Sequence, residues 1–245
     1  SNYLNVSANA LSKTYGDHDP ALTYTITKGN FLGSASGELT RSSGENVGSY
    51  TISKGSLSDP GGSTINFTNS TLTINKRNIT ATADNKSSIY GDADVPLTFQ
   101  TSDRGPLGAA LGGTPVRDTG SNVGSYTIRQ GSVVSTNNYN VTFVTGTYTI
   151  NRRSVTVTPN AGQTKVYGDN DPIIEFTAVN MVGAEVLNGT LERQGGNNVG
   201  DSYAIYQGSV TNANNGNYTV SFVGGVTFGI VPRPITITPN AGQTK

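Results

Sequence analysis

The chain has 245 residues, a formal net charge of zero, a pI near 6.5 and no cysteine. The lack of cysteine excludes disulfides and thiolate zinc sites. Phosphate binding usually requires a basic stripe, and the nearest features are the pairs Lys76-Arg77 and Arg152-Arg153, so we expect no nucleic-acid partner. No apolar run approaches the ~18 residues of a membrane helix, so we expect no membrane segment either.

Short strands with alternating apolar and polar residues are predicted along the whole chain. Clusters of Gly, Asn, Asp and Pro separate them and supply the turns. The best helix candidate is the short segment Met181–Leu187. In chain order, the clearest strands are 4–8, 22–26, 72–74, 148–150, 155–158, 228–230 and 235–238.

Several motifs recur in one register, which is the signature of a repeat protein. Arg41, Arg117 and Arg193 are each 76 residues apart, as are Pro20, Pro96 and Pro172. The segment Thr238–Lys245 duplicates Thr158–Lys165 without change. The other recurring motifs are Tyr-Gly-Asp at 15, 90 and 167, Asn-Val-Gly at 46, 122 and 198, and Asn-Tyr-x-Val-x-Phe at 138 and 217.

We therefore predict three tandem repeats, at 1–77, 78–153 and 154–234, with 235–245 as the first strand of a truncated fourth repeat. The restart at Ile235 suggests that the sequence is a piece of a longer array. Six or seven short strands in each repeat predict an all-β fold, a tandem array of small Ig-like β-sandwich-type repeats in an elongated rod. A β-grasp-like repeat with Met181–Leu187 as its one short helix stays open as an alternative.

The sequence resembles the MBG-type repeats of bacterial extracellular proteins, which are related to the YDG-type repeats. The resemblance rests on the segment Tyr15–Pro20 near the start of the repeat, the segment Leu39–Tyr50, the Asn-Tyr-x-Val-x-Phe motif and the alternating strand that ends each repeat. The first repeat departs from the pattern because it lacks the Asn-Tyr before Phe67. The family's functional residues are not well defined, so no site residue can be carried over.

The resemblance implies a module of large adhesin-like proteins, located outside the cell or on the bacterial surface. We expect a structural stalk that projects a binding tip or gives weak multivalent adhesion, and we expect no enzyme activity, catalytic residue or cofactor. Two alternatives stay open. One is a module that binds a host or matrix glycan or protein, and the other is an accessory region of a secreted glycoside hydrolase.

The Asp doublets that follow the Tyr-Gly pairs are the sharpest chemical feature. Two carboxylates with backbone carbonyls are ligands that calcium accepts, which makes a calcium site one hypothesis. The competing interpretation is an Asx-turn, or an ion pair with Arg41, Arg117 or Arg193. The candidate residues are Asp17, Asp19, Asp92, Asp94, Asp169 and Asp171.

The recurring tyrosines are interpreted as core residues with their hydroxyls near the surface, because each copy repeats them. They are Tyr15, Tyr90 and Tyr167, with Tyr50, Tyr126 and Tyr203. Tyr206 occurs only in the third repeat, and we expect it to be exposed. His18 is the one histidine and stands in one copy only, which speaks against a catalytic triad.

Overall fold

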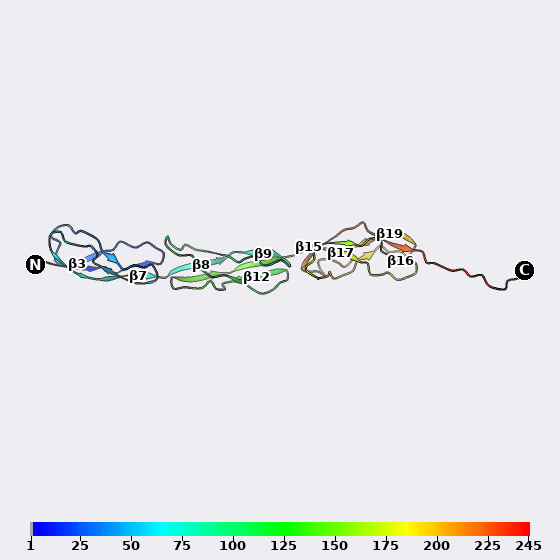
Figure 1. The fold of residues 1–245 in the computed structure, drawn as a ribbon, viewed down its shortest axis with the longest axis horizontal. Helices are drawn as coiled ribbons and strands as arrows, with labels where there is room; N and C mark the ends of the chain where they lie inside the picture. The colour runs from blue at the N-terminus through cyan, green and yellow to red at the C-terminus, as the bar shows by residue number, and fades with distance from the viewer. Residues whose placement is uncertain (1) are drawn as a thin grey trace. The chain divides into compact units, whose positions relative to one another are not determined.

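A computed structural model describes residues 2–245, and every regular element in that range is a β-strand (Figure 1). Met181–Leu187 forms turns, so the β-grasp-like alternative with a helix is wrong. Seven residues are too few for a helix that no packed face supports, and Gly183 among them has a φ of 53°. Among these residues no helix exists that could span a membrane. The prediction of an all-β fold built from repeats is confirmed.

Each repeat contains seven strands in the same order. Those of repeat 1 are β1 (Tyr3–Ala8), β2 (Leu11–Thr14), β3 (Tyr24–Lys28), β4 (Thr40–Arg41), β5 (Gly48–Ser53), β6 (Thr64–Thr68) and β7 (Ser70–Asn75). Those of repeat 2 are β8 (Arg77–Ala83), β9 (Lys86–Ile89), β10 (Phe99–Thr101), β11 (Val116–Arg117), β12 (Gly124–Arg129), β13 (Tyr139–Val144) and β14 (Gly146–Asn151). Those of repeat 3 are β15 (Arg153–Pro159), β16 (Thr164–Val166), β17 (Phe176–Val179), β18 (Glu192–Arg193), β19 (Gly200–Tyr206), β20 (Tyr218–Phe222) and β21 (Thr227–Val231).

The strands of each repeat form one three-stranded and one four-stranded sheet. The three-stranded sheets have the orders β3-β1-β6, β10-β8-β13 and β17-β15-β20. The four-stranded sheets have the orders β2-β7-β5-β4, β11-β12-β14-β9 and β16-β21-β19-β18. In repeat 1 the two sheets share a core, because Ala8 of β1 packs with Ile52 of β5 and Leu72 of β7.

The first and last segments of a repeat lie side by side and run in the same direction. In repeat 1, β1 pairs in parallel with β6, with Leu4 opposite Ile65, and β2 pairs in parallel with β7, with Leu11 opposite Leu72. Both segments change sheet at short breaks, after β1 and after β6. Repeat 3 has the same two parallel pairs, β15 with β20 and β16 with β21.

The chain divides into two compact units, and the division falls within repeat 2. The first unit contains Ser1–Lys86, Pro96–Asp118 and Thr127–Thr147, and the second contains Ser87–Val95, Thr119–Tyr126 and Tyr148–Lys245. Every contact described below between repeats 1 and 2 lies inside the first unit, and every contact between repeats 2 and 3 lies inside the second. The joints between repeats are therefore part of compact structure, not linkers.

Residues 235–245, expected to form the first strand of a fourth repeat, form no strand. Ile235 and Ile237 are 79% and 84% exposed, whereas Val155 and Val157 at the same positions of repeat 3 are 1% and 0% exposed. The reason is that β15 lies between two partner strands of its own repeat, β17 and β20, and 235–245 has neither.

Candidate functional site at the repeat junctions

Two tyrosines from successive repeats meet at the junction of repeats 1 and 2. Tyr15 follows β2 and Tyr139 begins β13; their ring centroids are 5.2 Å apart at 88°, an edge-to-face pair. Both rings are buried, at 6% and 3% exposure, and they share a cluster with Ile74 of repeat 1 and Ile79 of repeat 2. Such a ring pair is worth about 1 kcal/mol beyond the area it buries.

The asparagine that precedes Tyr139 closes the junction on a second side. The side-chain oxygen of Asn138 accepts from the backbone N–H of Val47 at 3.0 Å, and its amide nitrogen donates to the side-chain oxygen of Asn46 at 3.0 Å. The Asn138 amide thus binds both residues of the Asn-Val motif of the preceding repeat. A single side chain satisfies a backbone donor and an amide acceptor that would otherwise face water.

An arginine at the start of β8 joins the repeats on a third side. Nε of Arg77 donates to the carbonyl oxygen of Tyr15 at 2.7 Å, and its guanidinium pairs with Asp17. Gly16 lies between them with φ of 89°, and a Cβ there would stand 2.3 Å from the carbonyl oxygen of Arg104. The Tyr-Gly-Asp motif therefore serves the junction: ring, close approach and carboxylate each contact the next repeat.

The junction of repeats 2 and 3 uses the same residue types at the same places. The rings of Tyr90 and Tyr218 are 5.5 Å apart at 82°. Asn217 accepts from the N–H of Val123 at 3.0 Å, and Arg153 donates to the carbonyl of Tyr90 at 2.7 Å. The guanidinium of Arg153 also pairs with Asp92.

This second junction has one added group, the carboxylate of Glu185. Tyr90 donates to Glu185 Oε1 at 2.6 Å, and Tyr218 donates to its other oxygen. The hydrogen bonds from Tyr218 and Tyr90 lower the pKa of Glu185. The hydrogen bond with Glu185 raises the pKa of Tyr90. Burial, together with the hydrogen bond to Glu185, raises the pKa of Tyr218. At the first junction the hydroxyl of Tyr139 donates instead to the carbonyl of Ala109, at 2.6 Å.

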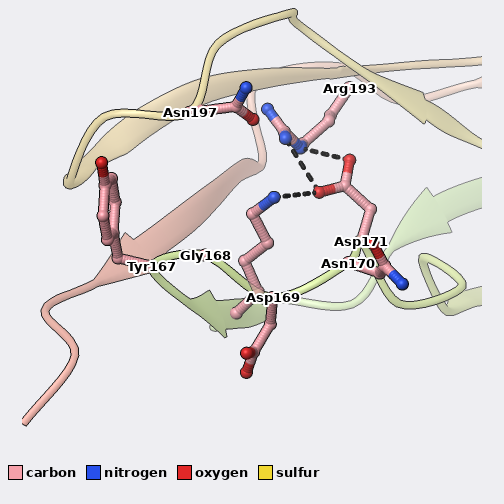
Figure 2. A pocket seen from close by; sticks show the side chains of 8 residues that line it. Tyr167, Gly168, Asp169, Asn170, Asp171, Arg193 and Asn197 are labelled. Atoms are coloured by element: carbon pink, nitrogen blue, oxygen red, sulfur yellow. Dashed lines mark hydrogen bonds and ion pairs between the residues drawn. The ribbon is translucent and has the colours of Figure 1, made fainter.

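The end of repeat 3 carries the same chemistry, and among residues 2–245 no folded repeat packs against it. Nε of Arg233 donates to the carbonyl of Tyr167 at 2.8 Å, and its guanidinium pairs with Asp169. The Tyr167 ring is 48% exposed here, and Val199 is 52% exposed. A polar depression of about 500 Å³ opens beside them, lined by Tyr167, Asp169, Asp171, Arg193 and Asn197 among others (Figure 2).

The two acids of the first and of the third doublet contact different partners. In Figure 2 Asp171 faces Arg193, whereas Asp169 points away from this pair. Asp171 receives two hydrogen bonds from Arg193, each of 2.8 Å, and an ion pair from Lys165 at 2.6 Å. Asp19 likewise pairs with Arg41 at 2.6 Å and with Lys13 at 2.8 Å.

The ion pairs that the sequence offered as an alternative to calcium are therefore formed by Asp19 and Asp171. Asp17 and Asp92 instead pair with Arg77 and Arg153, which begin β8 and β15, and Asp169 pairs with Arg233, which follows β21. Asp94 also has a partner. Among residues 2–245 no group of three or more His, Asp or Glu side chains is placed to hold a metal. The calcium hypothesis stays a prediction, and the ion must compete with bound arginines and lysines.

The charges around Lys13 form one connected cluster in repeat 1. Hydrogen bonds from Arg41, aided by Lys13, lower the pKa of Asp19 from 3.8 to about 2, against a smaller opposing effect of burial. Burial works to lower the pKa of Lys13, but the hydrogen bonds and charges of Asp19 and Glu45 outweigh it, and the pKa is raised. These charges are paired, and they fix the turn after β2 to the strand β4.

The prediction that the recurring tyrosines are core residues is wrong for Tyr167, which is 48% exposed; the other five divide into two groups. Tyr15 and Tyr90 are buried, but between repeats and not inside one. Tyr50 and Tyr203 are half-buried beneath the guanidiniums of Arg41 and Arg193, at 5.2 and 5.1 Å, and their hydroxyls donate to the carbonyls of Asn46 and Asn198. Their counterpart Tyr126 donates to the carbonyl of Asn122 at 2.6 Å.

The remaining singled-out residues lie outside the junctions. Tyr206 is 52% exposed, as expected. His18 is exposed in the turn beside Asp17 and Asp19. Sequence reasoning missed the junction role of Arg77, Arg153 and the Asn-Tyr pairs, although the recurrence of Asn-Tyr in repeats 2 and 3 and its loss from repeat 1 was the available signal.

Comparison with known proteins gives one result. The family model for the MBG domain (YGX type) matches residues 4–73, 79–149 and 155–228, which together cover most of the chain. No curated protein matches the sequence. Each matched segment begins on the first strand of a repeat (β1, β8 or β15) and ends within its last strand (β7, β14 or β21). The chain therefore belongs to the MBG domain family of the YGX type, as three tandem copies.

Proposed function

We propose that this chain is a non-catalytic mechanical spacer within a bacterial adhesin or similar protein, located on the cell surface or secreted. MBG domains of this kind occur in tandem and often in surface proteins, which supports the general setting. The observation that carries the mechanical role is the parallel pairing of the first and last segments in repeats 1 and 3.

The direction of these strands decides how a repeat responds to force. Tension enters at the start of β1 and leaves at the end of β7. Because β1 pairs with β6 and β2 with β7 along nearly the whole repeat, the two ends can separate only if these ladders shear. Many hydrogen bonds then carry the load together. An antiparallel pair of terminal strands would instead open one bond at a time.

The junctions support the same role because they leave little free linker. The last residue of β7 is Asn75 and β8 begins at Arg77, which contacts Tyr15 and Asp17. Repeats held in this way transmit force without a slack segment between them. The proposal therefore requires an extended array of stiffly joined repeats.

Single-molecule stretching of the chain between its ends tests the proposal. A repeat near 76 residues spans about 260 Å when extended and about 40 Å along its terminal strands when folded, so each unfolding event should lengthen the chain by roughly 220 Å. We expect three such events at clearly measurable force. Strands that peel apart with no resolved force peak would contradict the mechanical role.

Small-angle scattering tests the required extension. A compact globule of this length has a radius of gyration near ~18 Å. Three repeats of ~40 Å in line give about 35 Å. A value close to that of the globule would rule out the spacer, and a value close to that of the rod would support it.

Glycan binding is a second candidate, favoured by one polar pocket at the junction of repeats 2 and 3. This pocket of about 280 Å³ is lined by Tyr90, Glu185, Asn188, Asn214 and Asn217, among others. Amides and tyrosines are side chains that bind sugar hydroxyls. If the chain binds a glycan on an array and the Asn214→Ala variant does not, glycan binding is favoured. If the chain binds no glycan, the spacer is the one function that stands.

A further inference from the structure

We infer that the end of repeat 3 is an open docking face for a repeat that brings an Asn-Tyr pair at its N-terminal end, and that repeat 1 is not such a partner. The inference goes beyond the spacer function because it assigns a binding surface, its occupant and a polarity of assembly. It rests on the contacts of the two junctions already formed, and it holds whether or not the array carries force.

The face is identified by what is exposed there and buried elsewhere. Tyr167 is 48% exposed, whereas the equivalent rings of Tyr15 and Tyr90 are 6% and 9% exposed. The difference is not a local rearrangement, because Arg233 already holds the Tyr167 carbonyl and Asp169 as Arg77 and Arg153 hold theirs. What is lacking is a second ring against Tyr167.

The Asn-Val motif gives the same result at a second point. Val199 is 52% exposed, whereas Val47 and Val123 are half-buried and donate their N–H groups to Asn138 and Asn217. Asn198 keeps the arrangement of the other copies, since its carbonyl accepts from Tyr203. The face therefore offers an apolar ring, a backbone N–H and an amide in the spacing that an Asn-Tyr pair occupies twice in this chain.

Repeat 1 carries different residues at the positions that would fill the face. The strand registers place Asn2 at the position that Arg77 has in repeat 2, and Gly62 and Ser63 where repeat 2 has Asn138 and Tyr139. Its turn is closed on itself, because Asp59 accepts from the N–H groups of Leu32 at 3.0 Å and Gly61 at 2.9 Å. The chain can thus extend at the end of repeat 3, but two copies cannot join end to end by this junction.

An extended chain tests the inference directly. Thr238–Lys245 has the same sequence as Thr158–Lys165, so a copy of Val166–Pro234 can be added directly after Lys245. The added residues complete a fourth repeat with its own Asn-Tyr pair. The chain contains no cysteine, so Val199→Cys introduces a single thiol on the face. Its rate of reaction with a soluble disulfide reagent reports whether the face is covered.

The expected result is that this thiol reacts about tenfold more slowly in the extended chain than in the 245-residue chain, and close to the rate of a Val47→Cys variant. The matched control is the extended chain in which the added pair alone becomes Gly-Ser, as in repeat 1. There the rate should stay at that of the 245-residue chain. Equal rates with and without an added Asn-Tyr repeat whose circular dichroism shows it folded would overturn the inference.

A second experiment needs no added repeat. In the 245-residue chain, Asn217→Gly with Tyr218→Ser should open the existing junction, so that a Val123→Cys thiol becomes about tenfold more reactive. An unchanged rate would overturn the role of the Asn-Tyr pair even if the extended chain failed to fold. The scattering and stretching results are independent of both, so failure of the spacer function and failure of this inference can be told apart.

Discussion

Replacing Arg77 by alanine is expected to weaken the chain much more than replacing Arg233 by alanine. Both arginines make the same two contacts: Nε donates to a tyrosine carbonyl, at 2.7 Å to Tyr15 and 2.8 Å to Tyr167, and the guanidinium pairs with an aspartate. They differ in their surroundings. The Arg77 side chain is 15% exposed between two repeats, and the Arg233 side chain is 47% exposed.

The size of each effect follows from this difference in burial. A partly buried hydrogen bond from a charged group contributes about 1.5–3 kcal/mol, and its loss leaves the Tyr15 carbonyl without this partner. A solvent-exposed ion pair contributes ~0–1 kcal/mol. We therefore expect Arg77→Ala to cost about 2 kcal/mol and Arg233→Ala less than about 1 kcal/mol. Arg77→Lys should recover only part of the loss, because an ammonium cannot reach both acceptors as the planar fork does.

Amide hydrogen exchange measures the effect at the junction itself. The N–H of Leu107 in repeat 2 donates to the carbonyl of Gly16 in repeat 1 at 2.8 Å, so it exchanges only when the junction opens. A loss of about 2 kcal/mol should speed that exchange roughly 30-fold in Arg77→Ala and leave it unchanged in Arg233→Ala. Unchanged Leu107 exchange in Arg77→Ala, or equal destabilisation by both substitutions, would refute the reasoning.

Three further predictions concern the charged groups. The pKa of Glu185 is lowered by its tyrosine partners, so its contribution to stability is complete above the ordinary value of 4.5 and is lost as pH falls through the lowered value; the protection factor of the Val123 amide, which removes the intrinsic pH dependence of exchange, should fall on acidification, and Glu185→Gln should abolish that fall. Asp19→Asn should lower the melting temperature at pH 7 but not below pH 2, because the Asp19 pKa is about 2 and its ion pair is lost there in the parent. Millimolar calcium should leave the melting temperature unchanged, since Arg41 and Arg193 occupy the acids; a rise abolished by Asp171→Asn would revive the calcium site.

The sequence was sufficient for the fold class because period-2 alternation and turn residues are local signals. Leu4, Val6 and Ala8 alternate with polar residues, and all three are buried in the core. The parallel pairing of β1 with β6 could not be read in the same way. It joins segments some 60 residues apart, and alternation specifies which face is buried but not which strand lies alongside.

Only some contacts of the candidate site could be predicted from the sequence, for a related reason. The pairing of Asp19 with Arg41 was among the predicted ion pairs because both residues recur together within a repeat. The pairing of Asp17 with Arg77 crosses from one repeat to the next, so recurrence within a repeat does not reveal it. In the sequence, a residue at a repeat boundary resembles part of a loop. In the structure, Arg77 begins β8 and its side chain contacts the Tyr15 carbonyl in the turn after β2.

The recurrence of motifs along the chain takes a different meaning once the junctions are known. In the folded structure each Tyr-Gly-Asp and Asn-Val-Gly lies where its repeat meets the next one. Each Asn-Tyr lies on the face of the next repeat that contacts them. The landmarks thus come in complementary halves, and repeat 1 lacks the half that faces backward. A core role alone would expose no landmark in any copy. Tyr167 and Val199 are exposed in the one copy that no folded repeat follows among residues 2–245, and this is what a role in joining requires.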